Sequence, residues 1–233
     1  MSSATEGYLD HSFDNDFAGL ELKWLPWVGS RYQESACKTI ILGESIYLYG
    51  GEPSRQRILD KNSLRSRHIN HGILAKFKSR YLRNFERAVF KKNRPNLMER
   101  TDLWTGVIYH NLVPRLLESL KERPTHNDYT QGWSEFLQIT KVVQAQRCIV
   151  YGLESRKIRA LLELLADQHI EFRRSRLPEV GKNRPLLLTI QLETHPFEML
   201  FIRHPSAFFT WEKWALTLRE ANMLPVAETP DSA

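Results

Sequence analysis

Two short polar segments combine residue types that can divide acid and base chemistry. Residues 43–45 (Gly-Glu-Ser) follow one apolar run, and residues 204–206 (His-Pro-Ser) follow another. A carboxylate can orient or deprotonate a water molecule, and an imidazole can exchange a proton near neutral pH. Each segment alone is typical of an ordinary turn or loop. If both follow strands of one sheet, Glu44 and His204 would face each other across a crevice and share acid and base work.

Apolar runs alternate with amphipathic stretches along the chain. They predict strands at 38–42, 147–151, 186–192 and 198–202, and helices at 112–120, 129–143, 155–168 and 211–221. Strands that are apolar on both faces and separated by helices indicate a mostly parallel sheet covered on two sides. We therefore expect an α/β fold, a three-layer sandwich. Ligands bind outside the C-terminal strand ends of such sheets, where both polar segments lie.

Nothing in the composition divides the 233 residues, so we expect one domain over residues 1–224 and a flexible tail, 225–233. No stretch approaches the ~20 apolar residues of a membrane span, and the N-terminus is unlike a signal peptide. The two cysteines, Cys37 and Cys148, lack the spacing of a zinc or redox motif. We expect a cytoplasmic monomer that binds no membrane, no metal and no other cofactor.

Positive charge is concentrated in one part of the chain. Residues 53–100 hold 14 Lys and Arg against 3 Asp and Glu, whereas the whole chain has a net charge of +6. Apolar residues within 74–89 follow helical spacing, which puts Arg80, Arg83 and Arg87 on the opposite face. A face that is merely solvated usually mixes both signs of charge. The stripe favours an anionic partner, DNA before a membrane surface, with a solvated surface helix as the alternative.

Residues 43–47 read Gly-Glu-Ser-Ile-Tyr, residues 107–113 read Val-Ile-Tyr-His-Asn-Leu-Val, and residues 204–206 read His-Pro-Ser. The first and last resemble the two signature motifs of the uracil-DNA glycosylase superfamily, its G-Q-D-P-Y-H or G-E-A-P-G turn and its H-P-S loop. The middle segment resembles the strand that ends in a base-reading Asn. Residues 148–152 resemble the strand and glycine that precede a helix in that fold, and residues 24–29 are similar to a bacterial branch of the superfamily.

The resemblance implies a mostly parallel four-stranded central sheet and a DNA glycosylase. Such an enzyme hydrolyses the N-glycosidic bond of a flipped uracil or modified pyrimidine, including a hypermodified phage base, and leaves an abasic site. Glu44 would position or activate the water, and His204 would stabilise the departing base. Asn111 would read the base edge with its amide.

Further contacts follow from the same resemblance. Gly43 and Ser45 would line the substrate site, Ser206 would hold a backbone phosphate, and Tyr47 would pack against carbon 5 of the base. The adjacent aromatic residues Phe208 and Phe209 would fill the gap left by the flipped nucleotide, or lie half in the core. They therefore join the three arginines as candidate DNA contacts.

The sequence also departs from the family's pattern. Ser45 stands where the uracil enzymes have a water-activating Asp, and Leu48 replaces their terminal His. Ile46 replaces a stiffening Pro, so we expect Tyr47 to turn outward and admit carbon-5 substituents, with a ring that still blocks them as the alternative. Uracil and an enlarged base both remain open as substrates. Two cysteines cannot hold the iron–sulfur cluster of some branches.

Two other functions are compatible with the same residues. A protein of this fold without catalytic activity would bind DNA and leave its bases in place. A serine esterase would use Ser45 as nucleophile and His204 or His195 as base, although the Gly-x-Ser-x-Gly turn is broken at Tyr47 and no Asp completes a triad.

Overall fold

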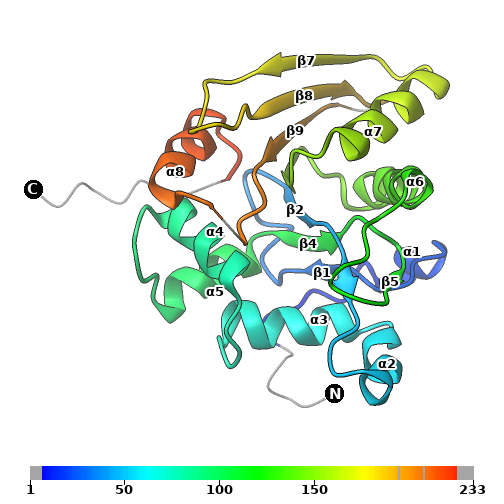
Figure 1. Ribbon diagram of the computed structural model, residues 1–233, viewed down its shortest axis with the longest axis vertical. Helices are drawn as coiled ribbons and strands as arrows, with labels where there is room; N and C mark the ends of the chain where they lie inside the picture. The colour runs from blue at the N-terminus through cyan, green and yellow to red at the C-terminus, as the bar shows by residue number, and fades with distance from the viewer. Residues whose placement is uncertain (1–6, 194, 207, 225–233) are drawn as a thin grey trace, which may run out of the picture.

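A seven-stranded sheet forms the centre of the protein. The computed structural model describes residues 7–193, 195–206 and 208–224, so the expected tail, 225–233, lies outside the described residues. The strand order is β1-β4-β2-β6-β9-β8-β7, and helices lie on both sides (Figure 1). The strands are β1 (Trp27–Val28), β2 (Thr39–Gly43), β4 (Ile108–Asn111), β6 (Arg147–Tyr151), β7 (Phe172–Arg176), β8 (Leu186–Gln191) and β9 (Pro196–Ile202).

The helices form the two outer layers. Helices α6 and α7 lie on one side of the sheet, and α4, α5 and α8 lie on the other (Figure 1). A small second sheet pairs β3 (Ile46–Tyr47) with β5 (Leu116–Leu117). In the part of the chain described, no helix has the length and apolar character needed to cross a membrane. The helices are α1 (Asp14–Ala18), α2 (Glu52–Leu59), α3 (Ser63–His68), the π-helix η2 (Ile69–Ile73), α4 (Arg80–Phe90), α5 (Leu97–Thr105), α6 (His126–Val143), α7 (Ser155–Asp167) and α8 (Trp211–Glu220).

The expectation of an α/β fold is confirmed, but the sheet is larger and more mixed than a four-stranded one. Strands β4, β2, β6 and β9 are neighbours and run parallel. Beside β4, the short strand β1 runs antiparallel to it. Beside β9, strands β8 and β7 continue the sheet, each antiparallel to its neighbour. Only residues 192–195 separate β8 from β9, and so short a connection returns the chain antiparallel instead of crossing over a face.

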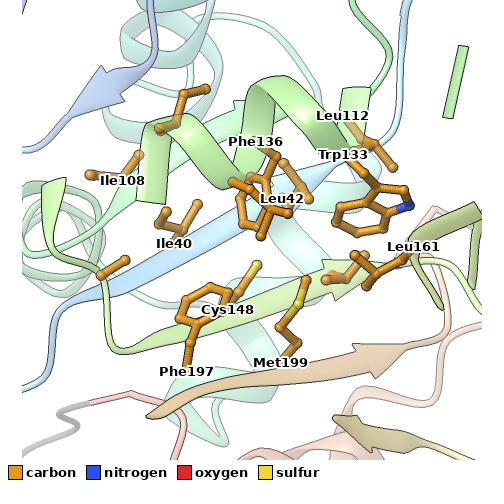
Figure 2. Close-up of a cluster of buried hydrophobic side chains, with 14 of the residues drawn as sticks. Ile40, Leu42, Ile108, Leu112, Trp133, Phe136, Cys148, Leu161, Phe197 and Met199 are labelled. Atoms are coloured by element: carbon orange, nitrogen blue, oxygen red, sulfur yellow. The ribbon is translucent and has the colours of Figure 1, made fainter. Parts of the chain in front are cut away.

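Each central strand is apolar on both faces because each face has its own core. Successive side chains of a strand alternate, so Ile40 and Leu42 of β2 belong to one core and Ile41 to the other. In the first core, Trp133 and Phe136 of α6 pack over the sheet (Figure 2). Trp133 Nε1 also donates a hydrogen bond to the backbone oxygen of Lys157, which joins α6 to α7.

Two predicted helices differ from the structure. Residues 112–120 form no helix: the Leu112 amide donates to the backbone oxygen of Gly43, Pro114 disfavours helical backbone at Val113, and residues 116–117 form β5. The basic helix begins only at Arg80, because residues 69–73 belong to the preceding π-helix and the chain turns at Ala75, where φ is +50°. Phe77, which helical spacing puts on the apolar face, is therefore 58% exposed.

Candidate functional site

The C-terminal ends of four parallel strands meet at one edge of the sheet. Glu44 follows β2, Asn111 ends β4, Gly152 follows β6 and His204 follows β9. The expectation that Glu44 and His204 lie at the same edge is therefore confirmed. The helix α7, which begins just after Gly152, brings further charged groups to the same place.

One oxygen of Glu44 is held and the other is not. Oε1 accepts hydrogen bonds from the Tyr129 hydroxyl of α6 and from Lys157 Nζ of α7, both at 3.1 Å. The side chain is 16% exposed, and Oε2 has no partner among the described residues. The carboxylate is fixed through Oε1 and keeps Oε2 available for a ligand or a water molecule.

Lys157 is the hub of this cluster. Its side chain is 1% exposed, and Nζ lies 3.1 Å from Glu44 Oε1, 2.7 Å from Glu154 Oε2 and 2.7 Å from the Tyr151 backbone oxygen. These contacts use all three ammonium protons. Gly152 has φ +101°, and a Cβ there would collide with Glu154 and Lys157. Glycine is needed at this strand end because the chain must turn and make room for the ion pairs.

Sequence reasoning missed Lys157, Glu154 and Tyr129. The sequence does carry a signal for Lys157, because it occupies a position of the apolar stripe of α7 together with Ala160 and Leu161. A lysine on the buried face of a helix, one turn after a strand-end glycine, needs a carboxylate partner. That partner can be sought only once the strand order is known.

His204 is half-buried against aromatic rings, and its surroundings favour the neutral imidazole. Its ring centroid lies 6.0 Å from that of Tyr81 and 5.7 Å from that of Tyr151. Burial lowers its pKa, and the opposing effect of the Glu44 charge does not outweigh this. The Ser206 amide donates to His204 Nδ1 at 3.2 Å. The ring proton therefore resides on Nε2, which is a hydrogen-bond donor.

Asn111 and Gly43 lie side by side at the ends of β4 and β2. The Tyr109 hydroxyl donates to Asn111 Oδ1 at 3.2 Å, which fixes the amide, and Nδ2 has no partner among the described residues. A Cβ at Gly43 would collide with Asn111 Oδ1 and the Tyr109 hydroxyl. Gly43 is thus required for close packing of this polar pair, and Asn111 presents donors for a ligand.

Tyr47 stays beside Glu44. Its backbone belongs to β3, which pairs with β5, and its side chain packs against the first core. Burial raises the pKa of Tyr47, and the negative charge of Glu44 raises it further. These features favour a fixed aromatic wall over a ring that has turned away. Ser206 is exposed, as a phosphate contact requires.

The three arginines of α4 differ in their surroundings. Arg80 is exposed. Arg83 is ion-paired to the fully buried Glu86 at 2.8 Å and donates to backbone oxygens of η2. Arg87 donates to the Asn93 backbone oxygen at 2.8 Å. Of the three arginines, Arg80 is exposed as a cationic face requires, whereas Arg83 is held by Glu86, three residues further along the same helix.

The two aromatic residues after the His-Pro-Ser segment also separate. Phe208 is 87% exposed, whereas Phe209 is buried and stacked on Trp214 with ring centroids 5.5 Å apart. Phe209 therefore packs against α8 and leaves little of its ring exposed. Asn84 Nδ2 donates to the Pro205 backbone oxygen at 2.7 Å, which fastens the loop to α4.

The arrangement does not favour an esterase. Ser45 Oγ is buried and makes no hydrogen bond to His204, whose Nδ1 is taken by Ser206. His195 lies beside Ala145, before β6 begins and thus at the opposite edge of the sheet. Within the described ranges, no group of three or more His, Cys, Asp or Glu side chains could hold a metal ion.

Comparison with known proteins adds no relative. No family model matches the chain, and no curated protein sequence matches it.

Proposed function

We propose that this protein is a DNA glycosylase that hydrolyses the N-glycosidic bond of a flipped pyrimidine, either uracil or a modified base. The observation that carries the proposal is the pairing, at one sheet edge, of a carboxylate held by one oxygen with a neutral imidazole whose free nitrogen is a donor. The two groups are close enough for the charge of Glu44 to act on His204. A carboxylate that can accept a proton and a donor that can stabilise the departing base are the groups that this hydrolysis requires.

Glu44 would act on the water. Oε2 accepts a proton from a water molecule as the water oxygen bonds to the anomeric carbon of the sugar, while Lys157 and Tyr129 hold Oε1 in place. The N-glycosidic bond breaks, and its electron pair leaves with the base. Glu44, now protonated, returns the proton to the base anion directly or through water, so the products are an abasic site with a new hydroxyl at the anomeric carbon, the neutral free base and the regenerated carboxylate.

His204 would act on the leaving base. The departing pyrimidine carries negative charge on its oxygens, and Nε2–H can donate a hydrogen bond to one of them. A neutral imidazole keeps its proton during this step, so the charge is stabilised by a preorganised dipole. The Asn111 Nδ2 donors, set by Tyr109, supply a second contact to the base edge.

Substitution at each end of the site tests the proposal. Glu44→Gln and His204→Ala should each slow base excision by roughly 10²-fold or more, because each removes a group that acts in the transition state. Neither should change DNA affinity greatly, because phosphate contacts dominate that affinity. Excision is followed as alkali-sensitive cleavage of labelled DNA that contains uracil or a modified pyrimidine.

Two surface variants serve as controls. Glu171→Gln and His126→Ala change the same residue types at exposed positions outside the cluster and should excise like the unaltered protein. Unaltered rates in both Glu44→Gln and His204→Ala would refute the assignment. Salt-sensitive binding without release of any base from any of these DNAs would identify the protein as a DNA-binding protein without catalytic activity.

A further inference from the structure

An open groove of ≈ 820 Å³ lies beside α4. It is next to the strand-end cluster, which consists of Glu44, Glu154, Lys157 and His204. One wall is α4 with the segment that precedes it, and the other is the segment from Phe208 to Trp211. The groove adjoins the proposed catalytic site, because α4 contributes Tyr81 to the surroundings of His204 and Asn84 to the hydrogen bond that fastens the His-Pro-Ser loop.

The lining of the groove is cationic. Lys78, Arg80, Arg83 and Arg87 all contribute, and no Asp or Glu is among the described residues that line it. Lys78 and Arg80 are exposed and form no ion pair within the part of the chain that the structure describes. An anionic occupant would therefore meet two uncommitted cations, and a polymer could continue beyond the open ends.

Two aromatic rings face solvent in the same groove. Phe77 is 58% exposed and Phe208 is 87% exposed. Phe208 has φ +51°, a conformation that costs energy for a bulky residue, and Ala75 of the same lining has φ +50°. The Arg203 guanidinium carbon lies 5.5 Å from the Phe208 ring centroid, so a cation covers that ring on one side. Neither ring is buried in the core, whereas the neighbouring Phe209 is buried and stacks on Trp214.

Exposed rings among cations fit unpaired bases better than a duplex. Bases of a single strand stack on aromatic side chains while its phosphates bind Lys and Arg, without dependence on sequence. In a duplex the base faces are covered by their neighbours, so rings at the surface would meet mainly sugar and phosphate. An acidic protein would satisfy the cations and leave the rings unexplained.

We infer that this groove binds single-stranded nucleic acid, with bases stacked on Phe77 and Phe208 and phosphates at Lys78 and Arg80. The inference rests on the proposed function and deepens it, because it specifies that the DNA flanking the target nucleotide is single-stranded. Its binding test is nevertheless independent of excision.

The test is fluorescence anisotropy with a labelled oligothymidylate of about 12 nucleotides, which is within the usual site size of single-strand binders. Phe77→Ala and Phe208→Ala should each weaken binding by roughly 5- to 100-fold. Phe77→Trp and Phe208→Trp should restore it, whereas the corresponding Leu variants should not, because stacking needs a ring. An oligouridylate arm distinguishes DNA from RNA as the source of the strand.

Phe172→Ala is the matched control, since Phe172 is an exposed phenylalanine of β7 outside the groove and its removal should leave binding unchanged. Tighter binding of a duplex of the same length, unaltered binding by both Ala variants, or equal competition by polyglutamate would overturn the inference. If one of these overturning results were found while Glu44→Gln still lost excision, only the single-strand inference would fail, and the glycosylase proposal would stand. Ring-dependent binding with no excision by the unaltered protein would refute only the glycosylase.

Discussion

Replacing Lys157 with methionine tests the hub of the strand-end cluster. Methionine matches the length of the lysine stem and removes the charge. Lys157 is the one residue that contacts Glu44, Glu154 and the end of β6 together among the residues described. Its role is to position Glu44, so its replacement should affect stability, rate and pH dependence at once.

The size of each effect follows from the contacts. Breaking a buried ion pair costs about 3–5 kcal/mol. Here the two carboxylates are 16% and 48% exposed, so water can reach them, and we expect a decrease of about 3 kcal/mol in unfolding free energy. Glu44 keeps its bond from Tyr129 but loses the second restraint, and a displacement of the order of 1 Å costs up to about 10²-fold in rate.

The pH profile gives a readout that a purely structural role would not change. Burial lowers the pKa of His204 most, and the positive charge of Lys157 lowers it further. Without that charge the pKa of His204 rises. Because the mechanism needs neutral His204, the decline of excision toward acid pH should begin at a higher pH in Lys157→Met.

The assay compares excision rates from about pH 5 to pH 9 and urea unfolding for the unaltered protein, Lys157→Met and Lys141→Met. Lys141 is a matched control, because it forms an exposed ion pair with Glu193 at 3.4 Å, and such pairs contribute about 0–1 kcal/mol. An unshifted acid limb with a slower rate would refute the electrostatic reasoning. Unaltered rate and stability would refute the positioning role itself.

Three other outcomes are expected. Burial raises the pKa of Glu86 to about 7, so Glu86 ionises at lower pH in the unfolded state than in the folded state. The free energy of unfolding should therefore fall by up to about 3 kcal/mol as the pH rises from about 4.5 to 7. Urea titrations measure this slope, and Glu86→Gln should abolish it. Arg80→Glu should weaken DNA binding and flatten its salt dependence by ~0.7 for each single-strand phosphate that the variant no longer neutralises, whereas Arg83→Glu should lower the melting temperature first. Tyr47→Ala should gain excision of thymine if the ring is a fixed wall; an unchanged base preference would show that it is not.

The fold class could be predicted because its signals are local. The apolar runs that become β2 and β6 are bounded by glycine, and the amphipathic period of α6 is long and regular. The edge at which Glu44 and His204 meet follows from the parallel direction of these strands. Both motifs could therefore be placed correctly without any knowledge of the tertiary contacts.

Other features depend on partners distant in sequence. The two-residue strand β3 exists only through its pairing with β5, and neither carries enough pattern to be predicted alone. β7 is exposed along its whole length and reads as a charged loop. Glu86 interrupts the apolar face of α4, where its Oε1 accepts a hydrogen bond from the Trp104 indole of α5. In each case tertiary pairing overrides local propensity.

The two borders of the large sheet differ in what they present to another strand. Residues 8–10 cover the free side of β1, where the Asp10 amide bonds to the Val28 backbone oxygen, so this border has little backbone to offer. At the other border, β7 carries Arg173, Arg174 and Arg176. Two copies that tried to extend their sheets through β7 would bring arginines of like charge together, which opposes pairing. Removal of these arginines should therefore lower solubility at high concentration, although they lie far from any proposed chemistry.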